Sequence, residues 1–256
     1  MPAGEAWNSR TERLLGGEAT ERLARSRVLV VGVGGVGGYA AEVLARSGVG
    51  DITIVDADCV AATNINRQLI ADTQTVGQPK TDLFEARFRA INPDISVTPV
   101  CSFVTPENVG SLLEPGYDIV IDAIDTVAPK TALLEECLKR GIPVLTSMGA
   151  GGRLDPTKVG YFDLCDTEGD GLARAVRQRL RKRGLRRGLT AVASTELPKR
   201  HSIVPLEERN KRSSFGTLAT IPAIFGIMLA NRAILHLTGF EPLKKPFFRP
   251  EPQKNA

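Results

Sequence analysis

Residues 27–58 read RVLVVGVGGVGGYAAEVLARSGVGDITIVDAD, and the fold of the chain follows from this stretch. The apolar, mostly β-branched run at 28–31 predicts a strand that is buried on both faces of a parallel sheet. A glycine-rich turn at 32–38 comes next, and the apolar stripe at 39–46 predicts a helix. A second strand is expected at 52–55. Glycine turns between a strand and a helix bind phosphate, because the backbone can approach the ligand and free N–H groups favour negative charge.

Five residues of this stretch are candidates for nucleotide binding. We expect Gly32, Gly34, Gly35 and Gly37 to form a phosphate-binding turn. We expect Asp56, about 20 residues later, to accept hydrogen bonds from ribose hydroxyls. The alternative is a tight strand–helix turn that binds no ligand. The acid at the end of the second strand favours a nucleotide site.

Strands and helices alternate over residues 28–147. Further strands are expected at 95–101, 117–121 and 144–147, and helices at 11–26, 79–90 and 130–140, with a short helix beginning at 105. This alternation predicts an α/β fold with a doubly wound, mostly parallel, Rossmann-like sheet and helices on both faces. Ligands of such sheets bind at the carboxyl ends of the strands, where Asp56, Asp122 and Asp125 are expected.

The second half of the chain has weaker patterns. A strand is expected at 159–164, and 188–214 is loop-like with one possible strand at 189–194. An apolar helix is expected at 215–237. The tail from 241 is rich in proline and lysine, and we expect it to be mobile.

The composition is that of a soluble globular protein. Of 256 residues, 42% are hydrophobic and 24% charged, and the net charge of +4 is too small to indicate nucleic acid by itself. The four cysteines form no CxxC pair, which argues against a zinc ribbon and favours reduced thiols in the cytosol. The N-terminus has no signal-peptide core, and Pro222 interrupts the apolar segment 217–230, so we expect a cytoplasmic protein with no membrane span.

A polar cluster follows the second strand, and it distinguishes an enzyme that binds a nucleoside triphosphate from a nicotinamide-dependent dehydrogenase. The turn and Asp56 would also suit a nicotinamide-dependent dehydrogenase, but hydride transfer does not need a set of residues that holds three phosphates. Such a set is formed by four residues of the long loop 57–75, by Lys80 at a helix start, and by Asp125 as a magnesium ligand. The four loop residues are Asn64, Asn66, Arg67 and Gln68.

Several motifs in the same order resemble the ATP-dependent adenylating superfamily that includes ubiquitin-activating enzymes and the bacterial proteins ThiF and MoeB. The matching residues are 32–37, Asp56, Asp58, 64–68, Lys80 and 122–125. Within the superfamily the chain is most similar to the tRNA threonylcarbamoyladenosine dehydratases. This narrower resemblance depends on 103–109, 120–125, 149–157, 194–196 and 215–216, and it covers roughly residues 10–240.

The resemblance implies that ATP activates a carboxylate, which in the dehydratases is the threonyl carboxylate of a modified adenosine beside the tRNA anticodon. The activated group is then cyclised with loss of water. The resemblance assigns catalytic roles to Arg67, Lys80, Asp125 and Arg13, and the last of these would enter the partner's site in a homodimer. Asp125 would hold Mg²⁺. ATP would be bound by the four turn glycines and by Asp56, Asp58, Asn64, Asn66, Gln68 and Asp122.

The length allows one α/β domain with a large core, and we expect one domain over 1–256. The ATP-binding core would be 1–165, followed by a basic substrate segment at 166–214, a helix returning to the core at 215–240 and a tail at 241–256. A sulfur-transfer protein is a possible partner. Cys165 lies where protein-activating relatives carry a reactive thiol, but nothing around it suggests a lowered pKa. We expect His201 and His236 to be structural.

An arginine run at 174–187 contains eight basic residues and no acid. It is either a solvated helical face or a surface for nucleic-acid phosphates. The residues that we expect to bind tRNA are Arg174, Arg177, Arg181, Lys182, Arg186 and Arg187. The alternatives for the whole chain are an adenylyltransferase for a ubiquitin-like sulfur carrier, an NAD-dependent dehydrogenase and a nucleotide-binding scaffold without catalysis.

Overall fold

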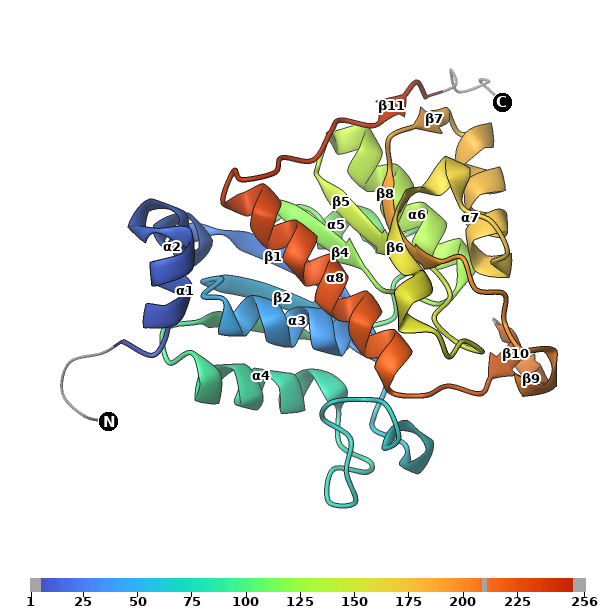
Figure 1. Ribbon diagram of the computed structural model, residues 1–256, viewed down its shortest axis with the longest axis horizontal. Coiled ribbons are helices and arrows are strands. Elements are labelled where there is room, and N and C mark those ends of the chain that lie inside the picture. The colour runs from blue at the N-terminus through green and yellow to red at the C-terminus, as the bar shows by residue number, and fades with distance from the viewer. Residues whose placement is uncertain (1–5, 209–210, 251–256) are drawn as a thin grey trace.

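The computed structural model describes residues 6–208 and 211–250, and its centre is a seven-stranded sheet (Figure 1). The strand order is β3-β2-β1-β4-β5-β8-β6, and only the edge strand β6 is antiparallel to its neighbour. The strands are β1 (Arg27–Val31), β2 (Asp51–Val55), β3 (Ser96–Val100), β4 (Ile119–Asp122), β5 (Val144–Ser147), β6 (Val159–Asp163) and β8 (Thr190–Ser194). The predicted Rossmann-like sheet is confirmed.

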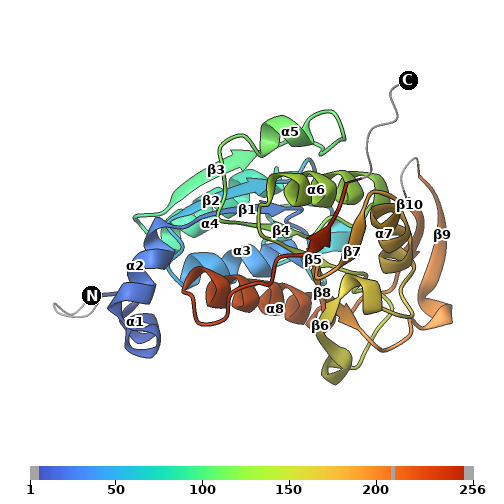
Figure 2. The same cartoon turned by 90° about the horizontal axis from the view of Figure 1, so that it is seen from above.

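Helices cover both faces of the sheet (Figure 2). They are α1 (Ser9–Leu15), α2 (Gly17–Arg25), α3 (Gly37–Arg46), α4 (Lys80–Ile91), α5 (Val109–Leu112), α6 (Val127–Arg140), α7 (Gly171–Lys182) and α8 (Thr220–Leu237). Alternate residues of β1 face opposite sides, because side chains alternate along a strand. Val28 and Val30 pack with α2, α3, α4 and α8, whereas Leu29 and Val31 pack with α5, α6 and α7.

The register of the sheet brings the predicted site residues to one edge. Val31 pairs with Val55 of β2 and with Asp122 of β4, so the three strands end together. The glycine turn, Asp56 and the turn that contains Asp125 therefore begin at the carboxyl edge of the sheet. This is the edge at which such folds bind ligands.

Two helix predictions were wrong in detail. The helix expected at 11–26 is divided into α1 and α2 by Gly16, whose φ of 86° is outside the helical range. The helix expected at 215–237 begins only at Thr220, because Phe215 pairs with Ile203 in a hairpin.

Four short strands were not predicted. The hairpin of β9 (Ile203–Glu208) and β10 (Lys211–Phe215) lies in the region that we expected to be loop-like. The tail is ordered where β11 (Phe247–Phe248) pairs with β7 (Leu185–Arg187), which contradicts the expectation of mobility for this part. Residues 251–256 lie outside the described residues.

Among the described residues, α8 is the helix that has the length and apolar character to cross a membrane. Its Ile221, Phe225, Leu229 and Ala233 are buried in the main hydrophobic core, against α3 and the sheet. This packing agrees with the expectation of a core helix in this segment.

Candidate functional site

The glycine turn has a backbone path that only glycine permits. Gly32 has a φ of +84° and donates its N–H to the Val55 carbonyl oxygen at 2.8 Å. A Cβ at Gly37 would lie 1.8 Å from the carbonyl oxygen of Gly32. The chain therefore folds tightly over the end of β1 and enters α3, whose first N–H groups point toward this edge and attract anions.

Two acids and a lysine lie beside this turn. Asp56 accepts hydrogen bonds from the N–H groups of Val33 at 2.8 Å and Asp58 at 2.9 Å. Lys80 Nζ lies 2.8 Å from Asp58 Oδ2 and 3.7 Å from Asp56 Oδ1. Burial raises the pKa of Asp56, and the nearby Lys80 opposes this shift. The structure thus brings Lys80 to the acids at the end of β2, and its contact with phosphate stays a prediction.

The polar loop is attached to the glycine turn and to the start of α8. Asn66 donates from Nδ2 to the Thr217 carbonyl oxygen at 2.9 Å, and its Oδ1 accepts from Arg67 Nη1 at 3.0 Å. The Arg67 side chain passes Gly35, where a Cβ would lie 3.4 Å from Arg67 Cγ. Asn64 uses its side-chain oxygen to accept the Ala61 N–H. Arg67 thus lies against the turn, whereas the oxygen of Asn64 shapes the loop.

Gln68 has a buried amide group beside the glycine turn. Its Oε1 is the buried side-chain polar atom without a hydrogen-bond partner in the described part of the chain. A Cβ at Gly34 would lie 3.6 Å from Gln68 Nε2, so the amide group faces the turn. An unsatisfied buried polar atom costs about 1–3 kcal/mol. The Gln68 amide thus lies beside the turn with one buried atom unsatisfied, and its contact with ATP stays a prediction.

Asp122, which we expected to bind the nucleotide, is engaged with other residues of the protein, and its contact with the nucleotide stays a prediction. Asp122 is fully buried and lies 2.7 Å from Lys130 Nζ, and its carboxylate also accepts from Thr146 Oγ1 at 2.7 Å and the Ile124 N–H at 3.1 Å. As the last residue of β4, it lies between neighbouring strands and under the site. Sequence reasoning missed Lys130, although it shares the apolar side of α6 with Leu134. A lysine at such a position signals a buried partner.

Asp125 lies in the exposed turn between β4 and α6. No group of three or more His, Cys, Asp or Glu residues in the described ranges could hold a metal ion. Mg²⁺ is often bound by one or two carboxylates together with substrate phosphates, so Asp125 fits a metal that arrives with a nucleotide.

Arg13 is not brought to this edge by its own chain. It lies on α1, which packs on α2, and α2 leads directly into the amino end of β1 (Figure 1). The loop 57–79 extends from the opposite edge of the sheet (Figure 1).

The arginine run forms α7 and β7, and acids from other segments neutralise part of it. Arg187 pairs with Asp166, and Arg183 pairs with Glu135. Arg177 donates to Thr167 Oγ1 at 2.8 Å, and Arg181 donates to the Cys165 carbonyl oxygen at 3.3 Å. The exposed basic residues with no ion pair to a described residue are Arg174, Arg179, Arg181, Lys182 and Arg186. The run itself contains no acid, but acids from other segments lower its net positive charge, so the sequence alone overestimates this charge.

A buried ion pair connects α7 to the carboxyl edge. Arg153 Nη2 lies 3.0 Å from Asp170 Oδ2, and the two side chains are 2% and 4% exposed. Asp170 also accepts the Ala173 N–H at 2.7 Å, which caps α7. Arg153 Nε donates to the Glu196 carbonyl oxygen at 2.9 Å. The pair therefore joins the segments after β5 and β8 to the basic helix, a connection that sequence reasoning did not reveal.

Two of the four thiols are made less reactive by burial. Burial raises the pKa of Cys165, whose thiol donates to the Arg186 carbonyl oxygen at 3.1 Å. Burial also raises the pKa of Cys137, which lies in the core. These directions agree with the expectation that Cys165 is not an activated nucleophile.

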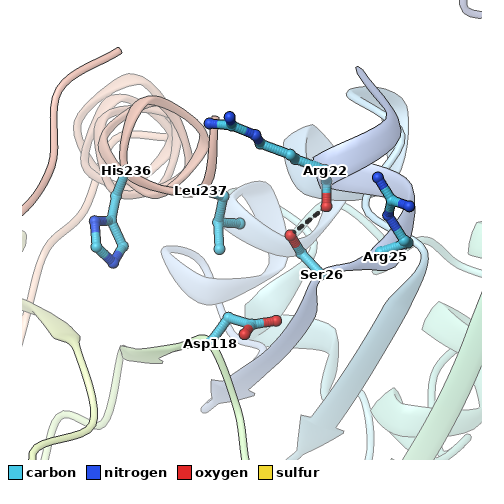
Figure 3. Close-up of a pocket in the computed structure, with 6 residues that line it drawn as sticks. All are labelled: Arg22, Arg25, Ser26, Asp118, His236 and Leu237. Carbon is cyan, nitrogen blue, oxygen red and sulfur yellow. Dashed lines mark hydrogen bonds between the residues drawn. The ribbon is translucent and has the colours of Figure 1, made fainter. Parts of the chain in front are cut away.

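The described structure includes two cavities that differ in their relation to the candidate site. The larger, about 380 Å³, lies near the amino end of β1 and contains none of the predicted site residues (Figure 3). Its Arg22 and Arg25 pair with Glu18 and Glu21. The smaller, about 220 Å³, is bounded by Thr217 and adjoins the polar loop through Asn66. The larger cavity therefore has no connection to the candidate site, whereas the smaller one has.

Comparison with known proteins agrees with this geometry. A model of the ThiF family matches residues 8–255. The chain is 42% identical over 237 residues to the tRNA threonylcarbamoyladenosine dehydratase of Bacillus subtilis, covering 90% of this chain and 93% of the relative. It is 41% identical over 252 residues to the Escherichia coli protein of the same name, covering 90% and 94%. The crystal structure of E. coli tRNA N6-threonylcarbamoyladenosine dehydratase in complex with ATP matches with a TM-score of 0.84 at 39% identity, covering 91% of this chain and 94% of that one. The chain belongs to the ThiF family.

Proposed function

We propose that this protein is an ATP-dependent tRNA threonylcarbamoyladenosine dehydratase. The observation that carries the proposal is the meeting of the glycine turn, the Asp56–Lys80–Asp58 cluster and Arg67 at one edge of the sheet. It occurs in a chain that matches dehydratases of this name over nine-tenths of its length, one of them solved with ATP. The substrate is the threonyl carboxylate of the modified adenosine in tRNA.

The residues at the carboxyl edge divide the binding of ATP between them. Asp56 is held by Val33 and Asp58, so its carboxylate is oriented for ribose hydroxyls. Arg67 offers donors beside the turn, and Lys80 adds a positive charge at the start of α4. Asp125 would hold Mg²⁺ together with phosphate oxygens. These cations stabilise the charge that develops on the phosphates.

The chemistry follows from the reactivity of a carboxylate. A carboxylate is a poor electrophile, and ATP supplies the group that turns one of its oxygens into a good leaving group. A nucleophile of the same side chain then attacks the carbonyl carbon, and that oxygen departs with the phosphate-containing product. The net result is a ring and the loss of water. Ring closure is fast because both reacting groups belong to one molecule, which gives a high effective concentration.

The partners of the site are tRNA and a second copy of the chain. The exposed basic residues of α7 would bind tRNA phosphates, which give affinity without sequence choice. Helix α1 buries none of its residues and exposes 82% of Leu14, so a second copy would cover it and bring Arg13 to the partner's site. We place the reaction in the cytoplasm, where such an enzyme meets tRNA.

The test is mass spectrometry of tRNA nucleosides after incubation of modified tRNA with the protein and ATP. We expect a loss of one water per modified adenosine, and at least a hundredfold lower turnover for Asp125→Ala with an unchanged fold. Lys80→Ala also abolishes turnover, and it lowers stability because the 4% exposed Lys80 neutralises Asp56. Adenylation of a carrier's C-terminal glycine, or reduction of NAD by an alcohol, in place of tRNA conversion would contradict the proposal.

A further inference from the structure

The smaller cavity, which we call the Thr217 pocket, has no role in ATP binding as described above. Three separate segments line it: 152–154 after β5, residues Lys199, His201 and Ser202 after β8, and 216–218 before α8. Its volume of about 220 Å³ is below the 300–1,000 Å³ that is usual for whole small-molecule ligands. The pocket is therefore suited to one part of a larger substrate.

The Thr217 pocket and the glycine turn share a wall. The Thr217 carbonyl oxygen accepts the hydrogen bond of Asn66, whose other side-chain atom binds Arg67. Five residues further on, Pro222 lies against Gly35, where a Cβ would be 3.4 Å from Pro222 Cβ. The segment 217–222 thus contacts both the pocket and the phosphate-binding turn.

The pocket is held in shape by backbone hydrogen bonds among its three segments. Gly152 donates to the Gly216 carbonyl oxygen, Gly216 to that of Ser202, and Lys199 to that of Gly152, each at 2.8 Å. The Glu196 carboxylate also fixes the segment 154–155, because it accepts hydrogen bonds from the N–H groups of Leu154 at 2.9 Å and Asp155 at 2.8 Å. These bonds lower the pKa of Glu196 to about 2, so it stays charged. The walls are formed before any ligand arrives.

The lining of the pocket is basic. It contains Arg153, Lys199 and His201, and none of the described lining residues is acidic. Arg153 is engaged with Asp170 and with backbone carbonyl groups. Lys199 has one ion pair, at 3.1 Å to Glu196, and keeps further donors. The exposed His201 has no hydrogen bond or ion pair to a described residue, so the structural role expected for it is not supported.

We propose that the Thr217 pocket holds the carboxylate-bearing side chain of the modified adenosine, with Lys199 and His201 binding the carboxylate. This inference rests on the proposed function, since it names the place where that substrate meets ATP. Cationic donors bind carboxylates in strong, charge-assisted hydrogen bonds. The shared wall directs the bound carboxylate toward the phosphates that activate it.

The test compares Lys199→Gln and His201→Gln with Arg200→Gln. Arg200 lies between them on the same exposed turn but does not line the pocket, so its variant controls for loss of surface charge. Kd is measured for tRNA with and without the threonylcarbamoyl group, and KM for modified tRNA and for ATP. We expect Lys199→Gln and His201→Gln each to raise the KM for modified tRNA about tenfold, the cost of one charge-assisted contact. They should leave the KM for ATP unchanged and abolish the preference for modified over unmodified tRNA.

Three outcomes overturn the inference. If wild type converts modified tRNA but both pocket variants behave as Arg200→Gln does, the pocket assignment is wrong and the proposed function stands. If wild type converts no modified tRNA, the pocket assignment and the proposed function are both wrong. If a peptide that ends in two glycines competes for the pocket and modified tRNA does not, the pocket binds a protein carboxylate instead.

Discussion

Lys130 and Asp122 form a fully buried ion pair beneath the candidate site, and its removal can be tested by unfolding. We expect Lys130→Met to lower the free energy of unfolding by about 3–5 kcal/mol at pH 8, because Asp122 is left buried without its cation. The control is Lys139→Met on the same helix, whose 44% exposed ammonium pairs with Glu135 and should cost less than about 1 kcal/mol.

The cost of Lys130→Met should also depend on pH. Burial raises the pKa of Asp122, and Lys130 is the largest opposing influence, so the variant raises this pKa further. An acid whose pKa is higher in the folded state destabilises the fold above that pKa, and the effect vanishes below its unfolded value of about 3.9. The deficit should therefore shrink when urea unfolding is repeated from pH 8 to pH 4. Equal effects of the two lysine variants at pH 8 would contradict this account.

The two acids of the DAID sequence at 122–125 show how far the role of a residue can be predicted from sequence. This motif indicates acids at the end of the fourth strand, and Asp122 ends β4 while Asp125 follows three residues later. It does not tell which one is exposed, because that depends on strand ends: Asp122 is the last residue of β4 and pairs in register with Thr146, whereas Asp125 lies beyond in an exposed turn. Similarly, the sequence places Asn64 and Asn66 in one polar loop, but it does not show the hydrogen bonds that fix them, which go to Ala61 and Thr217.

At the scale of elements, the orientation of α7 depends on one buried carboxylate. Asp170 caps the helix and neutralises Arg153. We expect Asp170→Ala to lower the free energy of unfolding by about 3–5 kcal/mol, because Arg153 becomes an unpaired buried charge. Urea unfolding measures the loss, and amide exchange should be faster in the first turn of α7 than in the core strands.

The matched control for Asp170→Ala is Asp155→Ala. Asp155 caps an exposed turn in the same way, by accepting the Thr157 N–H at 2.9 Å, but it has no buried cation. A cap alone is worth about 0.5–2 kcal/mol. If both variants cost the same, the buried pair contributes nothing beyond capping, and the connection between α7 and the sheet edge is not maintained by Arg153.

The sequence predicted the strands and helices whose apolar residues are buried in the core. It missed the strands that do not bury a run of such residues. The strands from β1 to β5 have runs of apolar residues because helices cover both faces of the sheet. The hairpin of β9 and β10 pairs only with itself, so its sequence has no core-facing pattern that could reveal it. The start of α8 was misplaced for a tertiary reason, since the hairpin and the bond from Gly152 to Gly216 hold the preceding residues out of a helix.

At the scale of the whole molecule, the residues that we propose to bind ATP come from the first half of the chain, and those that line the Thr217 pocket come from the second. Arg13 lies apart from the carboxyl edge, because α1 lies beside the amino end of β1 (Figure 1). If Arg13 serves catalysis, it therefore acts in the site of another copy. In a two-fold dimer each copy would then supply one α1 and receive one.

Subunit mixing tests this arrangement. Arg13→Ala and Asp125→Ala should each be inactive alone. In a mixed dimer, one site combines the intact Asp125 of the first copy with the intact Arg13 of the second, while the other site carries both changes. Equal mixing with free exchange makes about half of the dimers mixed, so activity should return to about a quarter of the wild-type value. If Arg13 acted within its own chain, every site would lack one residue and mixing would restore nothing. Conversion of modified tRNA, followed by mass spectrometry before and after mixing, distinguishes the two arrangements.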